Sequence, residues 1–270
     1  PPPDHAPSRR YPRRVPDPAR DGDLAEIASW LRDARRVVVL TGAGISTDSG
    51  IPDFRGPNGV WTRNPGAERR ANIEVYLADP EVRRRAWQSR LESPMHAAEP
   101  NAAHRALVEL ERKDALHLLV TQNIDGLHHA AGQSPELVVE IHGHVREAKC
   151  TSCRWRGPMA ETLARVAAGE VDPPCESCGG ILKAATVSFG ESLDPVDLDR
   201  AMRAADTADV FLALGTSLGV YPVADLPRRA RRHRARLVIA NAEETPFDRE
   251  ADRVVREPLA DILPAIADAV

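Results

Sequence analysis

Short, nearly continuous apolar runs recur along the chain, at 36–40, 117–120, 137–141, 210–214, 237–240 and 253–255. Runs of this kind are typical of strands that are buried on both faces of a parallel sheet. Amphipathic helical patterns lie between most of them, at 23–35, 101–113 and 197–205. This alternation predicts an α/β fold with a Rossmann-like, doubly wound parallel sheet, whose ligands bind at the carboxyl ends of the strands.

Two stretches interrupt the alternation, and a third precedes it. Residues 56–99 are polar and Arg-rich, with a predicted helix at about 80–91, and residues 145–186 contain all four cysteines. Residues 1–22 are rich in Pro and Arg and show no periodicity, so we expect a disordered arm. We therefore predict a sheet domain made of 23–144 and 187–270, with 56–99 as a helical insertion and 145–186 as a small inserted zinc-binding module.

Composition excludes several classes of protein. The net charge of −4 gives no general attraction to nucleic acid or membrane surfaces, and no apolar run approaches the roughly 20 residues that span a bilayer. No secretion signal is recognisable, so we expect a cytoplasmic protein. The densest basic run, 228–236, is interpreted as a solvated helix face, with a docking patch for an acidic partner as the alternative.

The first apolar run leads into a glycine-rich loop that suits a phosphate. In Thr41-Gly42-Ala43-Gly44-Ile45-Ser46 the glycines would let the backbone approach an anion at the start of the next helix. Thr47 stands where a third glycine would complete the dinucleotide fingerprint of dehydrogenases, which disfavours hydride transfer. The loop continues through Asp53-Phe54-Arg55, where the guanidinium suits a pyrophosphate or a carboxylate. The alternative is a tight turn followed by a solvated loop.

Two later strands also end in polar residues. Gln122-Asn123-Ile124-Asp125 follows the second run, and an Asn side chain matches the hydrogen-bonding groups of a carboxamide. His142 follows the third run beside Gly143, and an imidazole there is a candidate general base because its pKa lies near neutral pH. The alternatives are a polar loop with a helix cap and a structural histidine.

The cysteines form two C-x2-C pairs, Cys150 with Cys153 and Cys175 with Cys178, separated by 21 residues. Two such turns can close a tetrahedron of thiolates, and a site with four protein ligands has no open position for a substrate. The spacing therefore predicts one structural Zn²⁺, with iron or redox-active thiol pairs as alternatives.

Taken together, these motifs resemble the sirtuin family over nearly all of residues 23–265. The motifs that carry the resemblance are 42–56, 122–125, 140–143, the four cysteines, 189–191, 215–218 with Pro222, and Asn241. The resemblance implies a protein lysine deacylase of bacterial type that uses NAD as co-substrate, with a cleft between the sheet and the zinc module. Acyl-lysine proteins or peptides would be its partners.

The resemblance also implies which residues do what. The catalytic residues would be His142 and Asn123, and the peptide and its acyl group would contact Trp87, Arg90, Val187, Phe189, Gly190 and Glu191. NAD would be bound by Gly42, Ala43, Gly44, Ser46, Ile51, Asp53, Phe54, Arg55, Trp61, Gln122, Asn123, Ile124, Asp125, Gly215, Thr216, Ser217, Asn241, Ala242 and Glu243.

The implied reaction begins with loss of nicotinamide, after which the acyl oxygen of the substrate attacks the ribose. His142 would then take a proton from a ribose hydroxyl, and the products are free lysine and O-acyl-ADP-ribose. Two other functions stay open, a mono-ADP-ribosyltransferase on the same scaffold and a non-enzymatic adaptor that responds to NAD.

The chain departs from the family pattern near the substrate. The segment 182–187 reads Leu-Lys-Ala-Ala-Thr-Val, without the proline that usually follows the basic residue. Members that remove succinyl or malonyl groups carry Tyr-x-x-Arg on the inserted helix, whereas this chain has Trp87 and Arg90. We therefore expect plain or longer aliphatic acyl groups to be preferred over dicarboxylic ones.

Overall fold

A computed structural model describes residues 18–57, 59–64 and 66–270. Most of the predicted N-terminal arm lies outside the described residues. Its last residues are helical, because α1 runs over Pro18–Asp33 and so begins before the expected start at residue 23.

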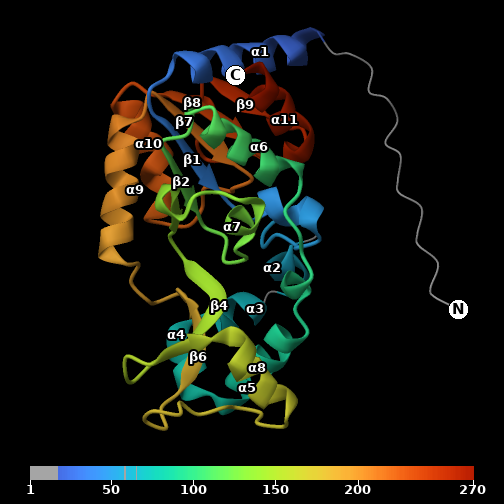
Figure 1. Cartoon of the computed structure of the whole chain (residues 1–270), viewed down its shortest axis with the longest axis vertical. Coiled ribbons are helices and arrows are strands. Elements are labelled where there is room, and N and C mark those ends of the chain that lie inside the picture. The colour runs from blue at the N-terminus through green and yellow to red at the C-terminus, as the bar shows by residue number, and fades with distance from the viewer. Residues whose placement is uncertain (1–17, 58, 65) are drawn as a thin grey trace, which may run out of the picture.

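The larger sheet has six strands, all parallel, in the order β3-β2-β1-β7-β8-β9 (Figure 1). Its strands are β1 (Val37–Thr41), β2 (Leu118–Thr121), β3 (Val138–Glu140), β7 (Val210–Leu214), β8 (Arg236–Ala240) and β9 (Arg253–Val255). Each matches one predicted apolar run to within two residues at either end. The predicted parallel α/β sheet is therefore confirmed.

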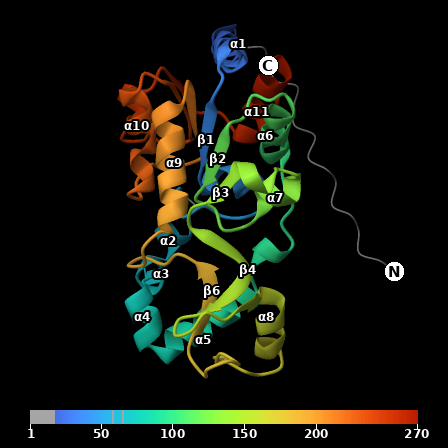
Figure 2. The same cartoon turned by 60° about the vertical axis from the view of Figure 1, so that its left-hand side comes forward.

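Helices cover both faces of this sheet (Figures 1 and 2). On one face lie α1, α6 (Ala102–Arg112) and α11 (Leu259–Ala269), and on the other α9 (Pro195–Thr207) and α10 (Leu226–Arg232). Alternate residues of β1 divide between the two cores, Val37 and Val39 facing the first and Val38 and Leu40 the second. Burial of both faces explains why the strands read as continuous apolar runs.

A smaller antiparallel sheet lies at the opposite end of the molecule, in the order β5-β4-β6 (Figure 2). It is formed by β4 (Gly143–Cys150), β5 (Arg156–Pro158) and β6 (Leu182–Thr186), with α8 (Met159–Ala167) beside it. Helix α5 (Pro80–Leu91) packs on α8, and its Trp87 lies in the same core cluster as Leu163 and Leu182. The helix of the 56–99 insertion therefore shares a core with the cysteine-bearing segment, although the sequence analysis grouped it with the sheet domain.

A largely buried ion pair also joins these two segments. The Nε of Arg83 on α5 donates to Asp172 of the cysteine-bearing segment at 2.8 Å, and its Nη1 donates to the carbonyl groups of Tyr76 and Leu77. The remaining helices are α2 (Val60–Arg63), α3 (Gly66–Arg70), α4 (Ile73–Ala78) and α7 (Leu127–Ala131). Short 3₁₀ helices occupy Ala43–Ser49, Pro94–His96, Pro135–Leu137, Val223–Asp225 and Asp248–Glu250.

The basic run on α10 and the turn after it is largely matched by acidic groups. Arg229 contacts Asp206, Arg231 and Arg236 contact Asp252, and Arg228 lies near Asp225 and Glu250. This pairing lowers the local positive charge, which agrees with a solvated face better than with a docking patch. Among the helices that the structure describes, none is both long enough and apolar enough to cross a membrane.

Candidate functional site

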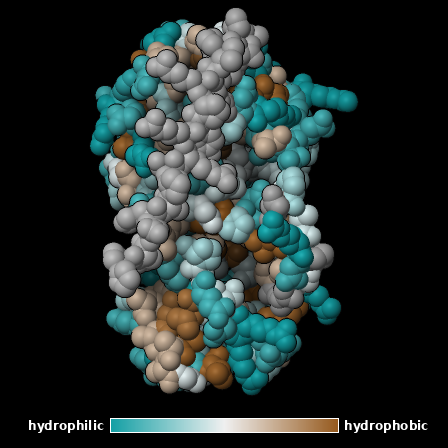
Figure 3. Space-filling model, turned by 90° about the vertical axis from the view of Figure 1, so that its right-hand side faces the viewer, coloured by the Kyte–Doolittle hydropathy of each residue, from teal (hydrophilic) through white to brown (hydrophobic). Residues whose placement is uncertain are grey.

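A cavity of about 1400 Å³ lies where the strands of the larger sheet end, between that sheet and the smaller one. It is lined by the loops that follow β1, β2, β3, β7 and β8, and by the segment that follows β6. Figure 3 shows hydrophobic surface in a hollow about midway along the molecule, and a second hydrophobic patch toward its lower end. All of the predicted NAD-binding residues line this cavity.

The loop after β1 interlocks with the loop after β7. A Cβ atom on Gly42 would lie 2.7 Å from the carbonyl oxygen of Gly215, and one on Gly44 would lie 2.7 Å from the Cα of Gly215. Gly215 itself has a φ of 61°, in the left-handed region that favours glycine. The sequence interpretation assigned Gly42 and Gly44 to a close approach by phosphate. Both do line the cavity, but the close approach seen here is between two loops of the protein.

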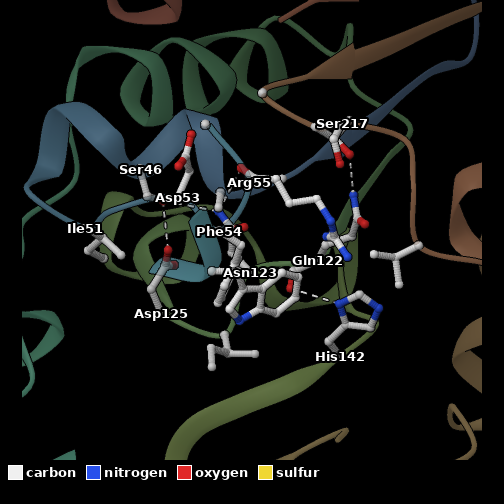
Figure 4. Close-up of a pocket in the computed structure, with 18 of the residues that line it drawn as sticks. Ser46, Ile51, Asp53, Phe54, Arg55, Gln122, Asn123, Asp125, His142 and Ser217 are labelled. Atoms are coloured by element: carbon white, nitrogen blue, oxygen red, sulfur yellow. Dashed lines mark hydrogen bonds between the residues drawn. The ribbon is translucent and has the colours of Figure 1, made fainter. Parts of the chain in front are cut away.

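A hydrogen-bonded chain joins the β1 and β2 loops (Figure 4). Asn123 Nδ2 donates to the carbonyl oxygen of Gly42 at 3.1 Å and to Ser46 Oγ at 3.2 Å, and Ser46 Oγ donates to Asp125 Oδ2 at 2.8 Å. The other oxygen of Asp125 accepts the backbone N–H of Leu127. Burial raises the pKa of Asp125, while these donors oppose the rise. This series of hydrogen bonds fixes the orientation of Asn123 and Asp125 at the cavity wall.

His142 enters the cavity from the end of β3. Its Nδ1 lies 3.1 Å from the carbonyl oxygen of Gln122. Because a carbonyl can only accept, the neutral ring carries its proton on Nδ1, and Nε2 keeps the lone pair. Burial lowers the pKa of His142, which keeps the ring neutral at physiological pH. The imidazole is thus prepared to accept a proton, and it shares one cavity with the loops 42–55 and 122–125.

Aromatic and cationic side chains gather over the β1 loop. The ring centroids of Phe54 and Trp61 lie 4.7 Å apart, those of Trp61 and Phe189 lie 5.6 Å apart, and the guanidinium carbon of Arg55 lies 4.3 Å from the Trp61 centroid. This cluster joins the loop after β1 to the segment after β6. Arg55 also approaches Glu68 at 3.4 Å, so its charge is partly matched.

The predicted NAD-binding residues that follow β7 and β8 line the same cavity. Thr216 Oγ1 accepts from Gln122 Nε2 at 2.9 Å, which ties the β7 loop to the β2 loop. Asn241, Ala242 and Glu243 follow β8, and Arg256 donates to the carbonyl oxygens of Asn241 and Glu243 at 2.9 Å. Arg256 was not predicted from the sequence, since its partners are carbonyl groups and no side-chain pattern marks them.

The structure places all but one of the predicted substrate residues at the cavity. Val187, Phe189, Gly190, Glu191 and Arg90 line the cavity, whereas Trp87 does not and has no exposed surface. Tyr76 and Lys183 also line the cavity near Arg90 and were not predicted as site residues. Burial raises the pKa of Tyr76 to about 12, and its hydroxyl donates to the carbonyl oxygen of Leu182 at 2.8 Å.

The four cysteines cluster on the smaller sheet and its adjoining turns. Their Sγ atoms all lie within 4.8 Å of one another, with Cys150 and Cys178 at 3.6 Å and Cys153 and Cys175 at 3.8 Å. Four sulfurs about 2.3 Å from a central zinc ion stand roughly 3.8 Å apart in a tetrahedron, so these positions fit Zn²⁺. None of the four cysteines lines the cavity, which agrees with a structural role for the metal.

Asn101 is a further residue that the sequence analysis treated only as a helix start. Its Nδ2 donates to the carbonyl oxygen of Ile45 at 2.7 Å and to Ser49 Oγ at 3.1 Å, while its Oδ1 caps α6. It therefore attaches the 3₁₀ helix Ala43–Ser49 to the helix layer. The helical pattern in the sequence begins at Asn101, but the partners of its Nδ2 lie about fifty residues away along the chain.

The structure is thus an α/β protein with a parallel sheet of the nucleotide-binding type and an inserted four-cysteine module. A cavity between these two parts is lined by a neutral histidine. The Sir2 family model matches residues 42–222, and the chain belongs to this family. The family assigned from sequence motifs is therefore confirmed.

Individual relatives support the same family assignment. "NAD-dependent protein deacetylase 2" of Streptomyces coelicolor is 56% identical over 230 residues, which is 85% of this chain and 95% of that protein. The solved structure of Sir2 with a p53 peptide and NAD⁺ has a TM-score of 0.80 at 34% identity, over 90% of this chain and 96% of that one. Sir2Tm bound to a propionylated peptide has a TM-score of 0.81 at 34% identity, over 91% and 97%.

Proposed function

We propose that this protein is an NAD-dependent protein lysine deacylase, which transfers an acyl group from lysine to ADP-ribose and releases nicotinamide. The observation that carries the proposal is the position of His142, which lines the same cavity as the loops after β1 and β2 and whose Nδ1 faces the Gln122 carbonyl, so that Nε2 is left to accept a proton. The membership of this chain in the Sir2 family and its similarity to NAD-dependent deacetylases support the same activity.

The roles of the residues follow from their chemistry. NAD supplies an electrophilic ribose carbon once nicotinamide has left. Asn123 and Asp125, held in place by Ser46, are positioned to bind the nicotinamide and ribose end. His142 accepts a proton at Nε2, a step to which a general base contributes on the order of 10² to 10⁴ in rate.

The remaining NAD contacts divide between two loops. The loop after β1 contributes Ala43, Asp53, Phe54 and Arg55, and the β7 and β8 loops contribute Gly215, Thr216, Ser217 and Asn241 for the adenosine half. The four cysteines would hold one Zn²⁺, whose contribution is to fix the fold of the smaller sheet.

The substrate is proposed to be an acyl-lysine in an extended peptide. Val187 continues β6 and lies at the cavity beside Phe189, where a peptide strand could pair with its backbone. Acetyl and longer aliphatic acyl groups are proposed ahead of dicarboxylic ones. A structural relative bound to a propionylated peptide supports the inclusion of an acyl group longer than acetyl. A cytoplasmic location is also proposed, since four clustered cysteines that form no disulfide suit a reducing compartment.

The test is a screen of acetyl-, propionyl-, butyryl- and succinyl-lysine peptides with NAD, followed by mass spectrometry. We expect deacylated peptide and O-acyl-ADP-ribose in equal amounts, and the His142→Ala variant should lose turnover while still binding NAD. Label from NAD that becomes fixed to protein would instead support a mono-ADP-ribosyltransferase. NAD binding without nicotinamide release from any acyl-peptide would support a non-enzymatic adaptor.

A further inference from the structure

The carboxylate of Glu191 is the centre of a charged cluster beneath the substrate segment 187–191. Lys183 Nζ on β6 donates to Glu191 Oε2 at 2.7 Å, and Lys149 Nζ on β4 lies 3.3 Å from Oε1. The backbone N–H of Ser188 also donates to Oε2, at 2.8 Å. The side chain of Lys183 is only 2% exposed, so this is a buried ion pair.

Lys183 makes a second bond that leads toward the candidate base. Its Nζ donates to the carbonyl oxygen of Thr186 at 2.6 Å. The next residue, Val187, donates its N–H to the carbonyl oxygen of His142 at 2.8 Å. The Lys183 amine therefore bonds to residues at both ends of the segment 187–191, to Thr186 just before it and to Glu191 at its end.

The same segment is attached at its other side to the inserted stretch around α3 and α4. The N–H of Phe189 donates to the carbonyl oxygen of Ala71, and the carbonyl oxygen of Phe189 accepts from Ile73. Its ring meets Trp61, which in turn contacts Phe54. A displacement of the segment would therefore change the positions of the peptide, of His142 and of the loop after β1 together.

Burying a charged amine is costly, and a buried ion pair rarely adds net stability compared with apolar packing. What such a pair can supply is one defined arrangement of the groups that it joins. We propose that Lys183 is a positioning residue for the acyl-lysine peptide, and that it acts through Glu191 and Thr186 to fix the segment Val187–Glu191. This inference rests on the proposed deacylase function.

A pH dependence follows from the surroundings of Lys183. Burial lowers its pKa to about 8; Glu191 opposes this change, while Lys149 and Arg90 add to it. The nearby Tyr76 hydroxyl stays neutral, because its own pKa is raised. The charged amine is present below that pKa and lost as the pH rises through it. Peptide binding should therefore weaken above about pH 8.

The chain offers matched variants because it contains three lysines, Lys113, Lys149 and Lys183. Lys183→Met removes the charge at similar length, and Lys183→Arg keeps a charge that does not titrate in this range. Lys113→Met is the control, since its amine also donates to a carbonyl, that of Ala267, but Lys113 is not among the residues that line the cavity.

The first experiment measures binding of an acetyl-lysine peptide without other titratable groups, in the presence of ADP-ribose. At pH 7 we expect Lys183→Met to weaken peptide binding at least about tenfold, with ADP-ribose affinity unchanged. Wild type should lose affinity between about pH 7 and 9.5, while Lys183→Arg should not. Wild-type affinity in Lys183→Met, or an unchanged pH profile in Lys183→Arg, would overturn the proposal.

The second experiment does not depend on activity. Hydrogen–deuterium exchange should be faster over residues 187–191 in Lys183→Met than in wild type or Lys113→Met, because the Ser188 amide loses its ordered acceptor. If wild-type protein neither binds nor deacylates the peptide, the proposed function fails. The exchange measurement still decides whether Lys183 holds the segment, and unchanged exchange would refute that role.

Discussion

Replacing Trp87 tests whether this residue acts through packing or through the substrate. It has no exposed surface, lies in the core cluster with Leu163 and Leu182, and does not line the cavity. Its indole Nε1 is buried and has no hydrogen-bond partner among the described residues. The Arg90 guanidinium carbon lies 5.2 Å from its ring centroid.

Two substitutions separate the energetic contributions. Trp87→Ala removes the whole ring from a closed core, and such changes cost about 3 to 5 kcal/mol. Trp87→Phe removes less volume and also removes the unpaired N–H, whose burial costs about 1 to 3 kcal/mol. We therefore expect Trp87→Phe to cost less than about 2 kcal/mol. At about 2 to 4 °C per kcal/mol, Trp87→Ala should lower Tm by roughly 10 °C.

The assay combines thermal unfolding of the zinc-loaded protein with kcat/KM for acetyl-, propionyl- and succinyl-lysine peptides. We expect the ratio of these values in Trp87→Phe to equal that of wild type. A large change in acyl preference with an unchanged Tm would refute the packing argument and restore Trp87 to the substrate site.

Three further predictions concern the metal, the base and the interlocked loops. Removal of Zn²⁺ by a chelator should release one ion per chain and abolish activity along with the native circular dichroism of the smaller sheet; full activity of metal-free protein would contradict a structural role. Since burial lowers the pKa of His142 and the neutral ring is the base, kcat/KM should stay level as pH falls from about 7.5 to 6.5 and decline only below that. A decline centred above pH 7 would contradict this assignment. Gly42→Ala should weaken NAD binding at least about tenfold, because its Cβ meets backbone atoms of Gly215 and Thr216. Gly22→Ala, with open space around it, is the control, and equal NAD affinity in both variants would argue against the interlock.

The larger sheet could be predicted because its strands are buried on both faces, so their apolar character appears in the local sequence. The docking of α5 on α8 could not, since the apolar residues Val82 and Trp87 show that the helix has a buried side but not which surface covers it. The four-cysteine cluster was predictable, because the ligands are paired at short spacing and their chemistry selects the metal.

The candidate site shows the same division. The polar residues after each strand were found because parallel strands place their carboxyl ends at one edge. Lys183, Asn101 and Arg256 were missed as parts of the site, because they act on backbone groups of distant segments, and no residue type marks a backbone acceptor in the sequence. The sequence also indicated only part of the reason why position 42 is a glycine, since the neighbour that leaves no room for a side chain, Gly215, lies 173 positions along the chain.

The protonation pattern of His142 is a consequence of sheet register. β2 and β3 pair in parallel with Thr121 opposite Glu140, so the two strands end together, with Gln122 directly after β2 and His142 two residues after the end of β3. The Gln122 carbonyl can then accept from Nδ1, which leaves Nε2 as the proton acceptor. This carbonyl belongs to the backbone, so any residue at position 122 would supply it. Replacing Gln122 should therefore preserve the tautomer of His142 while removing the side-chain bond to Thr216. Nitrogen NMR of the imidazole in Gln122→Ala should therefore still show a proton on Nδ1, and a proton on Nε2 would show that the backbone does not set the base.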